Sequence, residues 1–235
     1  MIPVDNADEV TKVVVTDKDG NETEAAFEVK GGSIAISVSG DSTVRVQTGH
    51  ICYAKDFTDV DIDAWYHENV CYVLGKGLMK GTAADKFAPN DNLTRAMIVT
   101  ILYRAEGEPA TNRSIPFADV DMGSWYASAI IWAQQNGIVN GVTETEFAPN
   151  DNITREQIAA ILYRYAIYKG MDAVNLSENL GFADADEISE YAISAMNWAV
   201  GSGLIKGYED DTVRPLNNAT RAEAAAILER FIKAN

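Results

Sequence analysis

The sequence predicts a mainly α-helical protein in which three related repeats follow a small β module. Three observations lead to this fold class. A motif of the form Asn-x-Thr-Arg occurs three times, a Phe-x-Asp motif precedes each copy, and a glycine and a proline recur between the two motifs. Because an internal repeat indicates one supersecondary unit per copy, it sets the architecture of most of the chain.

Residues 1–50 have a strand pattern that differs from the rest of the chain. Residues 10–16 and 24–29 flank the turn sequence Asp-Lys-Asp-Gly-Asn, which favours a hairpin. Residues 33–39 alternate polar and apolar side chains, and residues 43–47 follow a Ser-Gly-Asp-Ser turn. Because so short a segment buries little surface, we interpret it as a small β module or the tail of a larger β domain.

The repeats are expected at residues 51–110, 111–175 and 176–235. The Phe-x-Asp loop opens each repeat, and two helices follow. The first helices are expected at 65–76, 125–136 and 190–202, each ending at a glycine. The second helices are expected at 95–105, 155–168 and 221–234. Their apolar residues fall at i, i+3, i+4 and i+7. One such helix cannot cover its own apolar stripe, so we expect the three second helices to share a core.

An arginine opens each second helix: Arg95, Arg155 and Arg221. The positive end of the helix dipole makes this position mildly unfavourable for a cation. A guanidinium at a helix start is, however, a good receptor for a carboxylate or phosphate. We therefore expect these arginines to bind an anion. The alternative is a salt bridge to a neighbouring repeat, for example to an aspartate of a Phe-x-Asp loop.

A second arginine recurs nine positions after the first. Nine residues turn a helix by about half a circle beyond whole turns, so we expect this set to face away from the first and to be structural: Arg104, Arg164 and Arg230. Capping boxes are expected at Thr154 and Thr220, because Gln or Glu follows three residues later.

Aromatic residues and carboxylates also recur. Trp65 and Trp125 open the first helices, where a tryptophan can either join the core or stack on a sugar, and the third repeat has Glu190-Tyr191 at this place. Trp132 and Trp198 lie deeper in the helices, where core packing is the simpler interpretation. Paired aspartates follow each Phe-x-Asp phenylalanine, but their spacing is not that of a calcium loop, and turn formation explains them more simply.

Composition excludes several functions. Lys and Arg number 19 against 35 Asp and Glu, a net charge of −16. A chain this acidic should not bind nucleic acid through its overall field. No apolar run is long enough for membrane insertion. No Ser/His/Asp or Cys/His arrangement indicates an enzyme, and no cofactor is expected. Cys52 and Cys71 have neither the spacing of a disulfide framework nor that of a zinc site, so no metal is expected and Cys71 reads as a buried thiol.

The order of motifs resembles the S-layer homology (SLH) domain family: Phe-x-Asp, Trp-Tyr, Gly-x-x-x-Gly, Phe-x-Pro and Thr-Arg-Ala-Glu. The resemblance covers residues 57–235. It implies a monomer with internal pseudo-threefold symmetry, a central three-helix bundle and grooves between adjacent repeats. It also implies an extracellular protein, attached non-covalently to secondary cell-wall polysaccharide through an acidic, pyruvylated sugar.

The expected ligand-binding residues belong to the repeated motifs. They are Arg95, Arg155, Arg221, Trp65, Trp125, Asp59, Asp119, Asp184, Gly81, Gly141 and Gly207. No repeat carries every motif. The first has Thr-Arg-Ala-Met, the second has Thr-Arg-Glu-Gln, and the third lacks the tryptophan. One or two grooves are therefore expected to be degenerate.

Two other functions are compatible with the sequence. The repeats could mediate protein–protein assembly in a surface lattice, or the chain could be the anchor portion of an envelope enzyme whose catalytic domain is absent. Wall-polymer binding that depends on the pyruvate group would distinguish anchoring from assembly.

Overall fold

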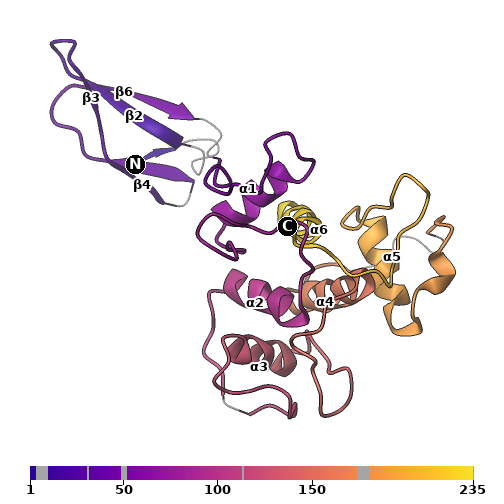
Figure 1. The fold of residues 1–235 in the computed structure, drawn as a ribbon. Coiled ribbons are helices and arrows are strands. Elements are labelled where there is room, and N and C mark those ends of the chain that lie inside the picture. The colour runs from indigo at the N-terminus through magenta and orange to yellow at the C-terminus, as the bar shows by residue number, and fades with distance from the viewer. Residues whose placement is uncertain (4–9, 31, 49–51, 113, 174–179, 235) are drawn as a thin grey trace. The chain divides into compact units, whose positions relative to one another are not determined.

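The computed structural model describes residues 1–3, 10–30, 32–48, 52–112, 114–173 and 180–234 (Figure 1). The chain divides into two compact units, Met1–Cys52 and Tyr53–Asn235. The first unit contains all the named strands and the second all the helices. None of the described helices combines the length and the apolar character needed to cross a bilayer.

The expectation of a mainly α-helical chain is wrong, because helix accounts for 33% and strand for 15% of the structure. The first unit forms two three-stranded antiparallel sheets, which fits the small β module expected there. The repeats also spend much of their length in long loops around short helices. The fold class is therefore mixed: a β unit plus a helical repeat unit.

The described residues of the β unit form six strands. They are β1 (Ile2–Pro3), β2 (Val10–Thr16), β3 (Glu22–Glu24), β4 (Phe27–Lys30), β5 (Ser33–Ile36) and β6 (Thr43–Thr48). One sheet has the order β1-β5-β4 and the other β3-β2-β6. Val10, Val13 and Ile34 are buried between them and form a small core.

The strand predicted at residues 24–29 is two strands. The chain leaves β3 after Glu24 and enters the other sheet as β4. At the change of sheet, the Ala25 N–H donates to the Val13 carbonyl oxygen at 2.9 Å, so the backbone stays bonded while it changes partners. The predicted strand at residues 10–16 and its hairpin turn are confirmed, since β2 pairs with β3.

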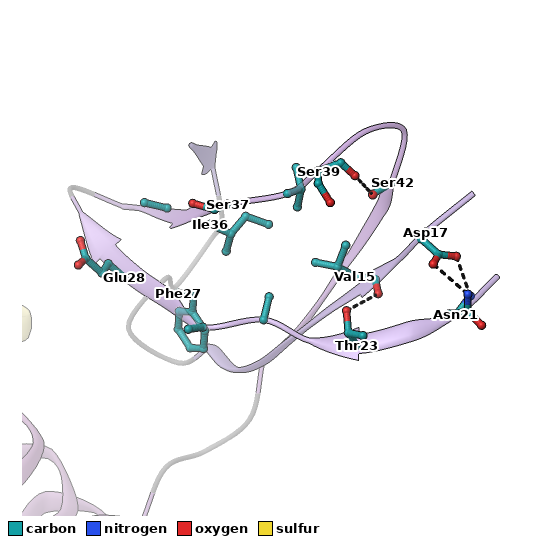
Figure 2. A pocket seen from close by; sticks show the side chains of 14 residues that line it. Val15, Asp17, Asn21, Thr23, Phe27, Glu28, Ile36, Ser37, Ser39 and Ser42 are labelled. Atoms are coloured by element: carbon teal, nitrogen blue, oxygen red, sulfur yellow. Dashed lines mark hydrogen bonds between the residues drawn. The ribbon is translucent and has the colours of Figure 1, made fainter. Parts of the chain in front are cut away.

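A hollow of about 830 Å³ is lined by residues of this β unit (Figure 2). Val15, Phe27 and Ile36 provide apolar surface in it, and at one end Asn21 Nδ2 donates to Asp17 Oδ2 at 2.9 Å. None of the residues singled out in the sequence as ligand-binding belongs to this lining. The hollow therefore contributes no part of the site predicted in the repeats.

The repeat unit has six α-helices. They are α1 (His67–Gly75), α2 (Arg95–Ala105), α3 (Ala127–Gln135), α4 (Arg155–Tyr168), α5 (Ile193–Gly201) and α6 (Arg221–Lys233). A short 3-10 helix, η3 (Glu190–Ala192), leads into α5. The predicted first turns of the second helices are confirmed, including capping boxes at Thr154 and Thr220 and the half-box at Thr94.

The main helix packing joins different repeats. α2 packs against α3, α4 against α5, and α6 against α1 (Figure 1). The first helix of each repeat thus covers the second helix of the preceding repeat, and α1 closes the cycle on the last one. The second helices meet through side chains, as where the rings of Tyr165 and Phe231 lie 5.6 Å apart.

The segments before the second helices bond in the same cyclic order. The Ile153 N–H donates to the Leu93 carbonyl, Ala219 N–H to Ile153, and Leu93 N–H to Ala219, each at 2.9 Å. These three apolar side chains are fully buried. No repeat can therefore complete its own backbone hydrogen bonds or cover its own core.

Candidate functional site

The helix-start arginines are buried and bound to a neighbouring repeat. Arg95 Nε donates to the Phe147 carbonyl at 2.8 Å, and its Nη2 lies 3.4 Å from the Asn140 carbonyl. Arg155 makes the equivalent bonds to Val213 and Lys206, both at 2.9 Å. Each arginine is no more than 6% exposed. These bonds explain the unfavourable position at the helix start, because the guanidinium ties one repeat to the next.

The third arginine, Arg221, makes the same kind of bonds from repeat three to repeat one. Arg221 Nε donates to the Phe87 carbonyl at 2.8 Å and its Nη2 to the Lys80 carbonyl at 2.7 Å. Its guanidinium carbon lies 4.6 Å from the centre of the Phe87 ring. The alternative of a salt bridge to a Phe-x-Asp carboxylate does not describe these bonds, since carbonyl oxygens accept them. A salt bridge to a neighbouring repeat does occur at Arg155, whose partner is Glu223.

The Phe-x-Asp carboxylates bind backbone amides. Asp59 accepts hydrogen bonds from the N–H groups of Phe87 and Ala88 at 2.9 and 2.8 Å. These bonds outweigh burial, which acts in the opposite direction, and hold the pKa of Asp59 below its usual value. The same paired bonds occur at Asp119, with Phe147 and Ala148, and at Asp184, with Val213 and Arg214. The aspartates thus fix the segment whose carbonyls receive the arginines.

Two of the cavities between repeats have linings that correspond position by position. Groove I has a volume of about 400 Å³ and is lined by Arg95, Asn140, Gly141, Val142, Gln157, Ala160, Ile161, Arg164 and Tyr191. Groove II has a volume of about 140 Å³ and is lined by Arg155, Lys206, Gly207, Tyr208, Glu223, Ala226, Ile227, Arg230 and Trp65. Each groove therefore takes an arginine from one repeat, a helix face from the next, and an aromatic residue from the remaining one.

The expectation that the second set of arginines lies away from the first is wrong for Arg164 and Arg230. Arg155 and Arg164 do face different sides of α4, but each side borders a different groove. Arg164 thereby joins Arg95 in groove I, and Arg230 joins Arg155 in groove II. Sequence spacing within one helix could not reveal this, because the partner arginine comes from another helix.

Groove I differs from groove II in its charged groups, because only groove II has a carboxylate in its lining. The lining of groove I holds two arginines and no carboxylate. Burial lowers the pKa of Arg95, and the charge of Arg164 acts in the same direction. Burial likewise lowers the pKa of Arg164. One buried and one partly exposed guanidinium group that line the same cavity favour an anionic ligand.

Groove II contains its own carboxylate. Glu223 Oε1 lies 3.7 Å from Arg155 Nη1, and the hydroxyl of Tyr208 donates to the same oxygen. Burial, followed by this hydrogen bond, raises the pKa of Tyr208 to about 12. The guanidinium carbons of Arg155 and Arg214 lie 4.9 and 3.9 Å from the centre of the Tyr208 ring. Arg155 therefore already has partners within the protein, while Lys206 and Arg230 also line this groove.

The predicted tryptophans are exposed, so the core interpretation for them is wrong. Trp65 is 64% and Trp125 60% exposed, whereas Trp132 and Trp198 are buried as expected. Trp65 contributes to groove II, and the edge of its ring packs on Tyr66. Trp125 packs on Tyr126 in the same way.

Tyr191 is the residue of the third repeat that sequence reasoning misplaced. The helices start after Tyr66, Tyr126 and Ala192, so Tyr191 occupies the place of Trp65 and Trp125. The sequence comparison aligned Glu190-Tyr191 with Trp65-Tyr66, which matches Tyr191 to Tyr66, because both pairs have an aromatic residue second. The structure shifts this alignment by one residue and matches Tyr191 to Trp65. The positions of the glycine stops, Gly77, Gly137 and Gly203, carry the signal that gives the correct register.

Tyr191 is tied to the second repeat by Glu156. Its hydroxyl donates to Glu156 Oε1 at 2.8 Å, and Ser189 donates to both carboxylate oxygens. Burial and then this hydrogen bond raise the pKa of Tyr191 above its usual value. The Glu156 side chain, where repeats one and three have alanine, therefore positions the aromatic wall of groove I.

The predicted glycines allow close approach of the chain. A Cβ at Gly141 would lie 2.1 Å from the Thr143 carbonyl oxygen, and one at Gly207 would lie 2.1 Å from Phe182 Cε1. At Gly81 it would meet Phe57 Cε1 at 2.4 Å. Gly141 and Gly207 line grooves I and II, whereas no lining described above includes Gly81.

Comparison with known proteins gives matches over the repeat unit. The chain is 36% identical to the surface-layer 125 kDa protein of Lysinibacillus sphaericus over 73% of its own length and 14% of that protein. It is 33% identical to an endoglucanase of Bacillus sp. (strain KSM-635) over 76% of the chain and 19% of the relative. It is 28% identical to a cellulosome-anchoring protein of Acetivibrio thermocellus over 71% of the chain and 39% of the relative.

The chain thus spans only a small part of each of these relatives. The S-layer homology domain matches three times, at residues 56–96, 116–159 and 181–225. Each match contains one Phe-x-Asp loop and one Thr-Arg helix start, and together they cover more than half of the chain. The chain therefore belongs to the S-layer homology domain family, with three tandem repeats.

Proposed function

We propose that the repeat unit is a non-catalytic anchor that binds an acidic, pyruvylated sugar of secondary cell-wall polysaccharide, mainly in groove I. The family and the surface-layer relatives indicate a location at the cell surface or in the cell wall. Relatives named as enzymes match over a minor part of their length, which suits a module that is joined to different partners. We further propose that the chain acts as a monomer.

The observation that carries the proposal is the pair of guanidinium groups in groove I. Arg95 and Arg164 line one cavity with no carboxylate in its lining. A pyruvate ketal on a sugar presents a carboxylate, which a guanidinium binds through charge-assisted hydrogen bonds. Because the chain as a whole is strongly acidic, an anionic polymer needs such a local cationic cavity.

The size and walls of groove I suit a sugar. A volume of about 400 Å³ lies within the usual range of ligand pockets. Tyr191 is 54% exposed and can stack on a sugar face, while Asn140 and Gln157 offer amide groups to hydroxyls. Val142 and Ile161 add apolar surface.

Groove II is proposed as the weaker site. Glu223 lies next to Arg155 and would repel a ligand carboxylate. Its exposed Trp65 remains available to a neutral sugar. By the repeat relation, a third groove would form around Arg221, with Trp125 as its aromatic wall.

Titration calorimetry with a pyruvylated disaccharide tests this assignment. Arg164→Ala should weaken binding roughly 10- to 150-fold, the equivalent of about 1.5–3 kcal/mol for a hydrogen bond to a charged group. The matched control is Arg230→Ala, at the same place in groove II, which should change affinity less than about threefold. Arg95→Ala is a poorer first test because it also removes two hydrogen bonds to the neighbouring repeat.

A second control uses the same disaccharide without pyruvate. It should bind wild type weakly and be insensitive to Arg164→Ala, because no carboxylate is present. Equal affinity of wild type and a folded Arg164→Ala variant for the pyruvylated sugar would contradict the proposed role of groove I.

A further inference from the structure

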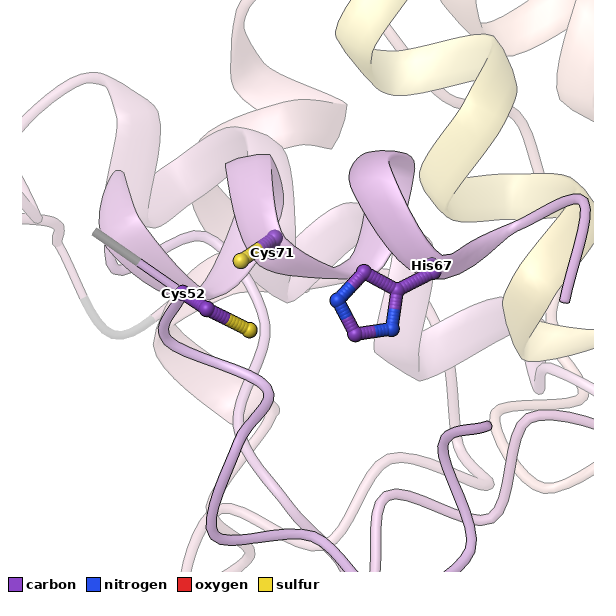
Figure 3. A group of neighbouring side chains, drawn as sticks. All are labelled: Cys52, His67 and Cys71. Atoms are coloured by element: carbon purple, nitrogen blue, oxygen red, sulfur yellow. The ribbon is translucent and has the colours of Figure 1, made fainter. Parts of the chain in front are cut away.

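The first repeat carries a group of metal-ligating side chains. Ligand atoms of Cys52, His67 and Cys71 all lie within 4.8 Å of one another (Figure 3). His67 and Cys71 stand four residues apart on α1, which places them on one face of the helix. Both are buried, at 6% and 2% exposure. Two sulfurs and an imidazole at this separation form a compact set of soft ligands.

The imidazole is oriented as in metal sites. His67 Nδ1 lies 3.1 Å from the Asp61 carbonyl oxygen. A hydrogen bond there places the proton on Nδ1 and leaves the lone pair on Nε2, the usual arrangement for a metal-ligating histidine. Figure 3 shows one ring nitrogen turned toward the two sulfurs.

The sulfur of Cys71 is also supported. The backbone N–H of Tyr53 donates to Cys71 Sγ at 3.0 Å. This bond holds the sulfur in a defined position beside the segment that carries Cys52. Cys52 is the chain neighbour of Tyr53, so one peptide bond and this hydrogen bond fix its place beside α1.

The other two repeats lack these ligands. The helix positions of His67 and Cys71 are Ala127 and Ile131 in repeat two, and Ile193 and Asn197 in repeat three. A helix of this fold therefore packs well without them. The two residues in repeat one need an explanation other than helix packing.

We propose that Cys52, His67 and Cys71 bind a thiophilic divalent cation, Zn²⁺ by the chemistry of the ligands, with water as the fourth ligand. Two thiolates and an imidazole suit zinc. Zinc bond lengths of about 2.3 Å to sulfur and 2.0–2.1 Å to nitrogen place tetrahedral ligands roughly 3.5–3.8 Å apart. Modest side-chain rotation would bring the three ligands to that separation. Binding releases the two thiol protons.

Cobalt titration of the full, reduced chain tests the proposal. Co²⁺ bound by thiolates in a tetrahedral site gives sulfur-to-metal charge-transfer bands and strong visible bands, and Zn²⁺ should displace it at one ion per chain. The variants His67→Ala and Cys71→Ile copy repeat two and should stay folded, and Cys52→Ser changes a part-exposed residue. Each should weaken binding by at least about 100-fold, since a lost ligand costs more than a lost outer partner.

Thermal unfolding of the same proteins gives a second readout. Zn²⁺ should raise the Tm of wild type, a chelator should reverse the effect, and the variants should not respond. A reduced wild-type chain that binds Co²⁺ no better than the His67→Ala, Cys71→Ile double variant would overturn the proposal. Recovery of Cys52 and Cys71 only as a mutual disulfide, the competing chemistry in an oxidising environment, would also overturn it.

Discussion

Groove I and groove II are built from equivalent positions of one repeated sequence, yet only groove II has a carboxylate in its lining. Gln157 in groove I is replaced by Glu223 in groove II. Both residues close a capping box at the start of their helix, so the helix does not distinguish them. The two residues differ in their effect on the groove, because Glu223 places a negative charge beside Arg155 whereas Gln157 adds no charge. This capping residue therefore decides whether the helix-start arginine of the groove has a carboxylate beside it.

The two grooves also share a helix. α4 gives Arg155 to groove II and Arg164 to groove I. Because each groove needs parts of all three repeats, a change in one repeat alters two grooves. The repeats are thus equivalent in scaffold and unequal in chemistry.

The largest expected difference between the grooves concerns their glycines. A Cβ at Gly141 would meet two backbone oxygens at 2.1 and 2.5 Å, while one at Gly207 would meet the movable ring of Phe182. Gly141→Ala should therefore lower the free energy of unfolding by more than about 3 kcal/mol, and Gly207→Ala by about 1–3 kcal/mol. Urea unfolding of both variants measures the difference. Equal losses would show that ring displacement is as costly as backbone displacement.

The next effect concerns the wall of groove I. Glu156→Ala leaves three donors of Ser189 and Tyr191 without their partner, and should destabilise the repeat unit by about 2 kcal/mol. Alanine itself fits, since Ala96 and Ala222 occupy this place in the other repeats. Thermal unfolding of Glu156→Ala beside Glu156→Gln, which keeps an acceptor, checks the reason. If the Glu156→Ala variant were as stable as wild type, the hydrogen bonds of Glu156 to Ser189 and Tyr191 would not stabilise the contact between repeats two and three.

An exchange of the two capping residues tests the charge argument directly. Gln157→Glu should weaken binding of the acidic disaccharide to groove I by about tenfold, because a carboxylate then faces the arginines. Glu223→Gln keeps the capping box and should add a second binding event by freeing Arg155. Calorimetric stoichiometry reports both outcomes. Unchanged binding in both variants would mean that this position does not distinguish the grooves.

The smallest effect is expected away from both grooves, where Glu106 accepts from Lys169 Nζ at 2.8 Å and from the Tyr165 hydroxyl. Burial acts to raise the pKa of Glu106, but these bonds outweigh it and lower the pKa from its ordinary value. A carboxyl with a lowered pKa in the folded state stabilises above its unfolded pKa, about 4.3, and loses this contribution as pH falls through the folded pKa.

Glu106→Gln should therefore cost less than about 1 kcal/mol at pH 7, since Lys169 is partly exposed. The difference from wild type should vanish at about pH 3. Unfolding measured at both pH values tests this, with Glu108→Gln as the control, because Glu108 is 4.0 Å from Arg104 and mostly exposed. A cost that is independent of pH would indicate that the ionised carboxylate is not the cause.

Local sequence signals predicted the starts of the second helices well, whereas the first helices begin later than expected, at His67, Ala127 and Ile193. The second helices begin at Arg95, Arg155 and Arg221, as their Thr caps indicated. The fold class was harder to predict from the sequence. The chain passes from one sheet to the other between β3 and β4, and an alternation of polar and apolar residues does not show such a change. The binding roles of the arginines, tryptophans, aspartates and glycines of the motifs stay predictions.

The sequence by itself determined the three repeats, their helix starts, their glycine stops and the family, because these depend on residues close together in the chain. Only the tertiary structure decided which residues meet. Arg95 faces Arg164, Arg155 is balanced by Glu223, and Cys52 meets His67 and Cys71. The physical reason is that each repeat completes its hydrogen bonds and its core on its neighbours. The chemistry of the two grooves is thus set by side chains far apart in the chain, such as Arg95 with Arg164 and Arg155 with Glu223, and no local pattern records such pairings.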